Sequence, residues 1–258
     1  MISKGKIKLI KSLEHKKYRD KESLFVAEGH KVVGEMMKTF RCVETFDEED
    51  DVRKITFMQH PQGIVGIFEK PQQDKDEYEI DPSRLYLALD KIQDPGNLGT
   101  IIRIADWFGI DTIFCSADTV DCWSPKVVQA TMGSLARVKV VYCDLCQLIE
   151  KSRKKQETRN KKQETRNEVA VYGTFLDGDN IYNESLTANG IIVMGNEGNG
   201  ISEAVRNKIT HRLLIPATRP GAESLNVAVA TAITLSEFRR QTFHLADNDN
   251  QPMADCTK

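Results

Sequence analysis

The sequence predicts an α/β protein whose larger part is built around a parallel β-sheet. From Leu85 to Gln241, short strands rich in β-branched residues alternate with helices. This alternation is typical of a parallel sheet that is covered by helices on both faces. A smaller α/β segment comes first, and a polar stretch containing Pro71 and Pro82 follows it. A chain of 258 residues is long enough for two such units.

The larger unit is expected to span residues 85–244. Its predicted strands are 85–89, 112–115, 138–142, 169–174, 191–194 and 212–215, and its predicted helices are 98–108, 202–209, 227–241 and two that begin at 125 and 144. In the first helix, Leu98, Ile101 and Ala105 recur at helical spacing and are expected to face the core. Asn97 stands where the N-cap of this helix is expected.

The smaller unit is expected to span residues 1–70. It is predicted to contain helices at 4–18 and 29–39 and strands at 24–27, 55–58 and 64–68. Residues 71–84 are polar and are interpreted as a linker between the units. The polar tail, residues 245–258, is expected to be disordered. The tandem heptads Lys154–Asn160 and Lys161–Asn167 lack an apolar seam and are interpreted as a surface extension.

The composition is that of a soluble globular protein, with 40% hydrophobic and 29% charged residues. No apolar run approaches the roughly 20 residues that cross a bilayer. Residues 1–8 are basic and lack an apolar segment after them, so we expect a cytoplasmic protein. Of the six cysteines, only Cys143 and Cys146 form a C-x-x-C pair, and no second pair accompanies it. We therefore expect reduced thiols and no metal site.

Positive charge gathers in the first 31 residues, where nine Lys and Arg face four acidic residues, although the whole chain carries −2. Such a local stripe is typical of phosphate binding, because neutralising phosphates releases counterions. A solvated helix face explains the charges equally well at this stage. The candidate nucleic-acid-binding residues in this stripe are Lys16, Lys17, Arg19 and Lys21.

Three loops that follow predicted strands are rich in glycine and small polar residues. They are Asp90–Gly99, Gly195–Gly200 and Ile215–Asn226. In open α/β sheets, ligands bind at the carboxyl ends of the strands. The second loop reads G-x-x-G-x-G, which is neither the dinucleotide fingerprint nor a phosphate loop, and a plain tight turn is the alternative.

Several polar residues near these loops also have ordinary structural explanations. Arg103 lies off the apolar stripe of its helix, and a surface pair with Asp106 at i+3 would account for it. Ser224 and Asn226 are both residue types that cap helices. The residues alone leave these alternatives open.

Together, the three loops resemble the three ordered motifs of the SpoU/TrmH-type RNA 2′-O-methyltransferases. The matching stretches are N-L-G-x-x-x-R-x-A from Asn97, V-M-G-N-E-G-x-G-I-S from Val193, and I-P…E-S-L-N-V-A-V-A from Ile215. The resemblance covers about residues 85–241. Residues 17–29 and 60–65 resemble the small RNA-binding domain that many such enzymes carry. Three motifs in order favour the functional interpretation of Arg103, Glu197 and Asn226.

The resemblance implies a C-terminal domain folded as a trefoil knot, a homodimer, and S-adenosylmethionine as the methyl donor. It places Gly195, Ile215, Leu225, Met132, Gly133, Gly198 and Gly200 at the cofactor, and Arg103, Asn97, Glu197, Ser224 and Asn226 at the reacting groups. In this family the motif-one arginine is proposed to activate the ribose 2′-hydroxyl. Because a guanidinium is not deprotonated in proteins, we expect Arg103 to hold a substrate phosphate and lower the pKa of the hydroxyl.

The resemblance further implies that RNA is the substrate and that no metal takes part. Ribosomal RNA is expected rather than transfer RNA, because the minimal enzymes that act on transfer RNA often lack the N-terminal domain. The same reaction on transfer RNA is the alternative substrate. A non-catalytic RNA-binding protein of the same fold is the alternative function.

Overall fold

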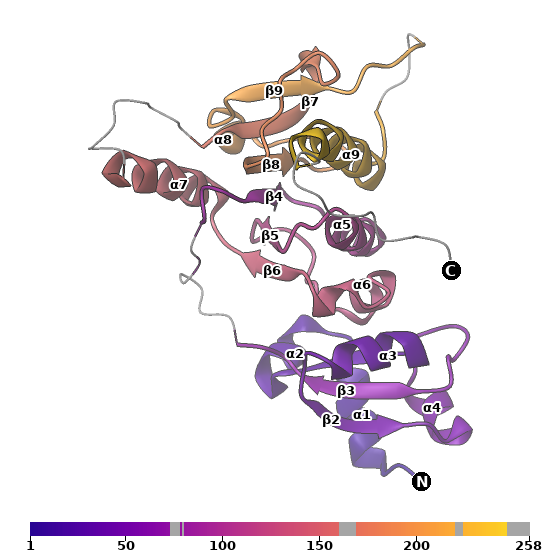
Figure 1. The fold of residues 1–258 in the computed structure, drawn as a ribbon. Coiled ribbons are helices and arrows are strands. Elements are labelled where there is room, and N and C mark those ends of the chain that lie inside the picture. The colour runs from indigo at the N-terminus through magenta and orange to yellow at the C-terminus, as the bar shows by residue number, and fades with distance from the viewer. Residues whose placement is uncertain (73–77, 79, 160–168, 220–223, 247–258) are drawn as a thin grey trace.

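A parallel sheet of six strands forms the larger part of the molecule (Figure 1). The computed structural model describes residues 1–72, 78, 80–159, 169–219 and 224–246. The strands are β4 (Leu85–Leu89), β5 (Thr112–Cys115), β6 (Lys139–Tyr142), β7 (Val171–Asn180), β8 (Gly190–Met194) and β9 (His211–Leu214). Their order is β6-β5-β4-β8-β7-β9, and neighbouring strands run parallel. The predicted fold class is confirmed.

Helices cover both faces of this sheet because alternate strand residues are apolar on each side. Leu87, Ile113 and Ile192 belong to one apolar cluster, and their neighbours Ala88, Phe114 and Val193 belong to another. The first face is covered by α5 (Pro95–Trp107), α6 (Pro125–Ala130) and α9 (Val227–Ala246), and the second by α7 (Leu145–Arg159) and α8 (Glu203–Arg206). A short 3₁₀ turn, η1 (Ser134–Ala136), follows α6.

The N-terminal part is built on a second, antiparallel sheet. Its strands are β1 (Leu24–Glu28), β2 (Cys42–Phe46) and β3 (Val65–Glu69), in the order β1-β3-β2, and its helices are α1 (Lys4–Ser12), α2 (Lys16–Glu22), α3 (His30–Met37) and α4 (Glu49–Ile55). Ile10 of α1 and Val52 of α4 pack with Ile67 on one face of this sheet. Met36 of α3 packs with Phe68 on the other.

Two local predictions in this part are wrong, and two elements were missed. The helix expected at 4–18 is divided into α1 and α2. The strand expected at 55–58 is absent, because Ile55 is the last residue of α4. The buried Glu28 carboxylate then accepts from the Thr56 hydroxyl and from the Phe57 N–H, the latter at 2.7 Å, and holds the chain there. Neither β2 nor α4 was expected.

In the larger part, the N-cap of α5 is Asp94 and not Asn97. The Asp94 Oδ1 accepts from the Asn97 N–H at 2.7 Å, and Pro95 begins the helix. The Asn97 side chain is thereby free for another role. The second heptad copy and residues 247–258 of the expected tail lie outside the described residues, as do residues 73–77 and 79 of the predicted linker.

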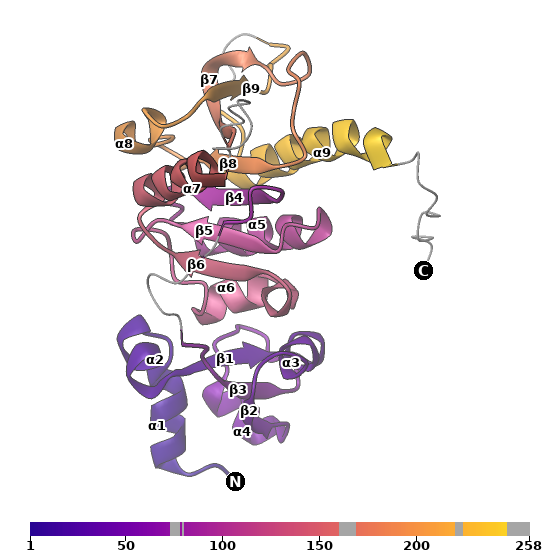
Figure 2. The same cartoon turned by 60° about the vertical axis from the view of Figure 1, so that its left-hand side comes forward.

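The two parts share a continuous apolar core. Trp123, which precedes α6, packs against Phe25 of β1 and Phe40, with ring centroids 4.8 and 5.5 Å apart. These rings belong with the apolar side chains of the first face of the parallel sheet. Figure 2 shows the antiparallel sheet lying against α6. The boundaries at residues 70 and 85 stay a prediction. None of the described helices has the length and apolar character to cross a membrane.

Candidate functional site

The candidate site lies where four neighbouring strands end. In the sheet, β4, β8, β7 and β9 are adjacent and parallel, so their carboxyl ends lie at one edge. The loops that leave this edge are the three glycine-rich loops of the sequence and a bulge in β7. Loops that are more than a hundred residues apart in sequence can therefore contact one another at this edge.

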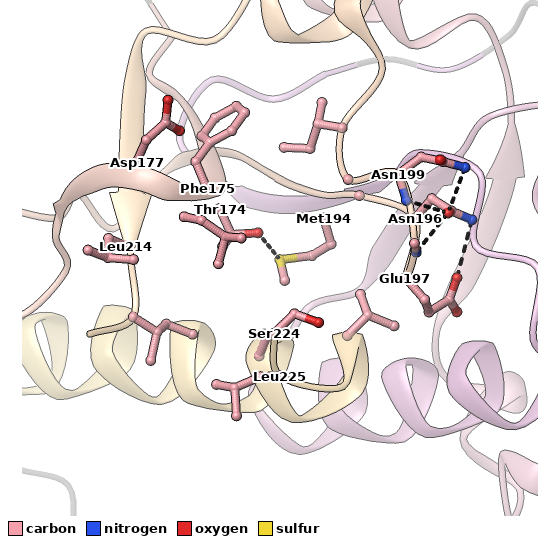
Figure 3. A pocket seen from close by; sticks show the side chains of 18 of the residues that line it. Thr174, Phe175, Asp177, Met194, Asn196, Glu197, Asn199, Leu214, Ser224 and Leu225 are labelled. Carbon is pink, nitrogen blue, oxygen red and sulfur yellow. Dashed lines mark hydrogen bonds between the residues drawn. The ribbon is translucent and has the colours of Figure 1, made fainter. Parts of the chain in front are cut away.

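A pocket of about 690 Å³ opens at this edge (Figure 3). This volume falls in the ordinary range for small-molecule and cofactor sites. Its lining includes most of the residues that the resemblance assigned to the cofactor, namely Gly195, Gly198, Gly200, Ile215 and Leu225, together with Glu197 and Ser224. Apolar side chains such as Met194, Leu214 and Val227 form much of the remaining wall.

The loop from Gly195 to Gly200 closes on itself as a compact turn. Asn196 and Gly200 exchange two backbone hydrogen bonds of 3.0 and 2.9 Å. The Asn196 Oδ1 accepts from the N–H groups of Gly198 and Asn199, both at 3.0 Å. A Cβ on Gly195 would lie 2.3 Å from the carbonyl carbon of Gly200, so no other residue fits that position without moving the backbone.

A chain of three side chains joins the three loops, and we call it the Asn–Asn–Glu chain. The Asn226 Nδ2 donates to the Asn97 Oδ1 at 2.9 Å, and the Asn97 Nδ2 donates to the Glu197 Oε1 at 2.9 Å. The partners are 129 and 100 residues apart in sequence. The structure thus brings together three predicted residues, each from a different loop. Of these, only Glu197 lines the pocket.

Asn226 serves two purposes at once. Its Oδ1 accepts from the Ala228 N–H at 2.9 Å, in the first turn of α9, while its Nδ2 reaches Asn97. The capping explanation and the site explanation therefore both hold for this residue. The adjoining Ser224 and Leu225 lie at the pocket wall near the start of the same helix, as Figure 3 shows.

Asp90 is a site residue that the sequence did not single out. It follows β4, is only 2% exposed, and its Oδ2 accepts from the Ser202 N–H at 2.7 Å. The Asn196 Nδ2 donates to the carbonyl of the next residue, Lys91, at 2.8 Å. These bonds tie the first loop to the second. An acidic residue directly after five apolar strand residues was the signal that could have revealed it.

Arg103 lies on the exposed side of α5 and outside the pocket lining. The alternative pair with Asp106 is absent, because Asp106 accepts from Arg137 at 3.0 Å from Nε and 2.7 Å from Nη2. Arg103 has no hydrogen bond or ion pair with the described residues. Its guanidinium is therefore available to a partner from outside the described part of the chain.

Met132 and Gly133 are not brought to the pocket. They follow α6 at the contact with the N-terminal part, and a Cβ on Gly133 would lie 2.7 Å from the Glu35 Cγ. Gly133 has a φ of +101°, which lets the chain pass close to α3 there. In this chain, the position of Gly133 is explained by packing against α3, and Met132 is exposed and lies outside the pocket lining.

Arg19 is a structural residue, and its predicted contact with RNA is wrong. It is 2% exposed, and its Nη1 donates to the carbonyls of Leu13 and Glu14, both at 2.7 Å. Its Nε and Nη2 donate to the Asp121 Oδ2 at 3.0 and 2.6 Å, which joins the N-terminal part to the larger part. A charge that is buried and paired in this way cannot reach a phosphate.

The other predicted RNA contacts are exposed. The Lys16 Nζ lies 5.9 Å from the centre of the Tyr142 ring, and the Lys21 Nζ lies 3.1 Å from a Glu22 carboxylate oxygen. Lys17 is also exposed. These three lysines stay candidates for RNA binding.

The pair Cys143 and Cys146 does not have the properties of a reactive centre. Burial raises the pKa of the Cys143 thiol to about 11, and it also raises the pKa of Cys146. A thiol with a raised pKa is protonated at neutral pH and is a poor nucleophile. Within the described ranges, no cluster of His, Cys, Asp or Glu could hold a metal ion.

Comparisons with known proteins identify the family. The model of the SpoU rRNA methylase family matches residues 84–236, and that of an MRM3-like substrate binding domain matches residues 4–47. The 23S rRNA (guanosine(2553)-2′-O)-methyltransferase RlmP of Bacillus subtilis is 30% identical over 255 residues, covering 91% of this chain and 96% of the relative.

Two solved structures are similar over nearly the whole chain. A protein of the TrmH family of RNA methyltransferases from Porphyromonas gingivalis has 38% identity and a TM-score of 0.80, covering 93% of this chain and 99% of that one. An AdoMet-bound rRNA methyltransferase from Sinorhizobium meliloti has 28% identity and a TM-score of 0.77, covering 93% and 96%. With a family model that matches more than half of its length, this chain belongs to the SpoU rRNA methylase family.

Proposed function

We propose that this protein transfers a methyl group from S-adenosylmethionine to a ribose 2′-hydroxyl of RNA. The observation that carries the proposal is the Asn–Asn–Glu chain, which joins three loops beside one pocket. Without that convergence, each loop motif would be explained by a local turn or cap. Family membership and the AdoMet-bound relative support the same reaction.

The pocket fits S-adenosylmethionine by its size and its chemistry. The described charged residues in its lining are Asp177, Glu197 and Arg206, which together carry one net negative charge. S-adenosylmethionine carries one net positive charge, so the two are complementary. When bound, this cofactor supplies a methyl group on a positively charged sulfur. Its contacts are assigned to Gly195, Ile215 and Leu225, with Gly198 and Gly200 in the same wall.

The protein contributes alignment and charge to the reaction. Glu197 is oriented by Asn97 and by the Asn196 amide, which lies 3.3 Å from the Glu197 Oε2. Held at the pocket, this carboxylate orients the reacting groups, while Ser224 and Asn226 shape the site. Arg103 holds a substrate phosphate, and its positive charge lowers the pKa of the 2′-hydroxyl. Alignment of nucleophile and leaving group is a large source of rate acceleration in such displacements.

The substrate is proposed to be ribosomal RNA. The match of residues 4–47 to a substrate-binding domain and the activity in the name of the relative RlmP support this choice. Lys16, Lys17 and Lys21 are proposed to contact RNA phosphates from this domain. Since ribosomal RNA is made in the cytoplasm of bacteria, we place the protein there.

The protein is further proposed to act as a homodimer with a knotted C-terminal domain. Trp107 at the end of α5 is 78% exposed, and Val229 on the adjacent helix α9 is 48% exposed. Exposed large apolar side chains on adjacent helices are typical of an interface. The knot is proposed from the family resemblance, with α9, which lies beside α5, as the helix that threads it.

A methyl-transfer assay tests the function. Purified protein is incubated with S-adenosyl[methyl-³H]methionine and RNA from cells that lack the gene, and the labelled RNA is digested to nucleosides. We expect label in ribosomal RNA, as one 2′-O-methyl nucleoside. Label in transfer RNA would change the substrate, and label on a base would overturn the reaction. Binding of RNA without any transfer would identify a non-catalytic RNA-binding protein.

A further inference from the structure

A bulge in β7 places a group of charged and aromatic residues at the pocket. The β7–β9 ladder pairs Thr174 with Leu213 and then Asp179 with the same Leu213, so residues 175–178 leave the ladder. A Cβ on Gly178 would lie 2.7 Å from the carbonyl oxygen of Arg212, which shows how tightly the bulge folds back on β9. Bulges of this kind redirect side chains and are common beside functional sites.

Two arginines meet on one ring of this bulge, and we call them the arginine pair. The guanidinium carbons of Arg206 and Arg212 lie 4.8 and 4.4 Å from the centre of the Phe175 ring. Both guanidiniums also pair with the Asp177 carboxylate, Arg206 at 3.3 Å. The ring and the carboxylate hold two flexible side chains in place before any ligand arrives.

The charges of this group do not cancel. The hydrogen bond from Arg212, with the nearby charge of Arg206, keeps the pKa of Asp177 below its ordinary value, so its carboxylate is charged at neutral pH. Two positive charges therefore face one negative charge. The side chains of Arg206 and Arg212 are 42% and 39% exposed. The Arg212 Nε is buried and has no hydrogen-bond partner among the described residues.

The group lies at the end of the pocket away from the Asn–Asn–Glu chain. Figure 3 shows Phe175 and Asp177 at one end and Asn196 and Glu197 at the other. Arg206 lines the pocket, whereas Arg212 stands behind it on β9. Both guanidiniums are partly exposed, so an RNA strand that lies over the pocket, with one ribose near Glu197, can reach them from the solvent side.

We propose that the arginine pair binds a backbone phosphate of the RNA strand that lies over the pocket, with Asp177 holding the two guanidiniums in position until the phosphate arrives. Arginine is suited to this role because its planar fork donates two parallel hydrogen bonds to phosphate oxygens. This inference rests on the proposed function, since it concerns the RNA strand at the same site. It assigns that strand a second contact in the larger part of the molecule, in addition to Arg103 and the N-terminal lysines.

The other anion that could meet a guanidinium here is the carboxylate of S-adenosylmethionine, inside the pocket. The two sources are separable. A carboxylate in the pocket would depend on Arg206 alone, because Arg212 does not line the pocket. A phosphate at the mouth would depend on both arginines and would make RNA affinity sensitive to salt at this position.

The test measures RNA and cofactor binding separately for the full-length protein. Arg206→Gln, Arg212→Gln and the matched control Arg84→Gln are titrated with a ribosomal RNA fragment at 50 to 200 mM salt, and with S-adenosylmethionine by calorimetry. Arg84 is a suitable control because it also pairs with acidic residues, Asp81 and Asp111, but lies at the amino end of β4. Thermal unfolding checks that each variant is folded.

We expect Arg206→Gln and Arg212→Gln each to lose one phosphate contact. Raising the salt from 50 to 200 mM weakens RNA binding by the wild type. It then weakens RNA binding by each variant about threefold less. Affinity for S-adenosylmethionine stays unchanged in Arg212→Gln, because Arg212 lies outside the pocket lining, and Arg84→Gln behaves as the wild type. Asp177→Asn, which removes the competing carboxylate, binds RNA more tightly than the wild type does.

Two results would overturn the inference. One is an unchanged salt dependence in folded Arg212→Gln. The other is a loss of cofactor affinity in Arg206→Gln with RNA binding intact, which would assign the pair to the cofactor carboxylate. Both are measured by binding, so they are distinct from a failure of the proposed function, in which the wild type itself transfers no methyl group.

Discussion

Polar and charged side chains have different roles in two regions of the molecule. One region is the carboxyl edge of the parallel sheet, and the other is the contact between the N-terminal part and the larger part. At the edge, Asn97, Glu197 and Asn226 bond to one another at or near the surface, and Arg103 is exposed. At the contact between the two parts, Arg19 is buried, and each of its three nitrogen atoms donates to a protein oxygen. Buried charged groups that are paired with protein oxygens hold the fold together, whereas exposed polar groups that other loops hold in place are available for chemistry.

The largest expected effect on stability is at the contact between the N-terminal part and the larger part. Arg19→Met leaves the Asp121 carboxylate, whose side chain is 9% exposed, without its partner. Breaking a buried ion pair in this way costs about 3–5 kcal/mol. Urea unfolding measures the loss, with the exposed neighbour Lys17→Met as the control. An unfolding free energy equal to that of the wild type would contradict the structural role of Arg19.

The largest expected effect on activity is at Arg103. Arg103→Ala removes a positive charge that acts on the reacting groups, and such losses cost about 10²–10³ in rate. Steady-state methyl transfer measures this, and S-adenosylmethionine binding and thermal stability are expected to be unchanged. Because Arg103 has no partner among the described residues, a large loss of stability would show that its role is structural after all.

A smaller effect is expected at Gly195. In Gly195→Ala, the new Cβ meets the backbone of Gly200 and Ile201 at 2.3 Å, and the loop can relieve this only by shifting. Overpacking of this kind costs about 1–3 kcal/mol, so cofactor affinity should fall by about tenfold or more. The control is Gly34→Ala, where nothing lies within 4 Å of the added carbon. Calorimetry that finds equal affinities in both variants would exclude the loop from the cofactor site.

The smallest effect, and a pH-dependent one, is expected at Arg137. Burial alone would raise the pKa of Asp106, but hydrogen bonds from Arg137 and Ser134 hold it below its ordinary value. A lowered pKa in the folded protein adds stability above the unfolded pKa, about 4, and this stability disappears as the pH falls through the folded pKa.

The Tm of Arg137→Ala should therefore lie below that of the wild type at pH 7, and the difference should shrink below about pH 4. Arg53→Ala, which breaks an exposed i,i+4 pair with Glu49, serves as the control with little effect at either pH. A difference that grows on acidification would have the wrong sign for this pair.

The parallel sheet and the pocket were predictable because their signals are local. Apolar strands such as 85–89 and 112–115 are buried along their length and are bounded by clear turn residues. The loop motifs lie directly after strands, and topology then brings them to one edge. The Asn97 side chain was expected at the cap of α5, yet Asp94 takes that position, because sequence alone does not distinguish two capping residues three positions apart.

The N-terminal part was less predictable because its signals are weaker. The strand β2 is half exposed at the edge of its sheet, so it lacks a continuous apolar run. The acidic start and basic end of α4 agree with the helix dipole. With only seven residues, however, the helix is too short for a repeating pattern of apolar residues to be recognised. Burial of Arg19 depends on Asp121, 102 residues away, and no local pattern contains that information.

The most direct test of the contrast between the two regions is Asn97→Ala, measured for activity and stability in the same preparation. Asn97 is the middle member of the Asn–Asn–Glu chain, and its removal leaves Glu197 and Asn226 without their shared partner. We predict that methyl transfer falls by about tenfold or more while the unfolding free energy changes by less than about 1 kcal/mol. Unimpaired methyl transfer, with a stability loss as large as that of Arg19→Met, would contradict a catalytic site at this edge.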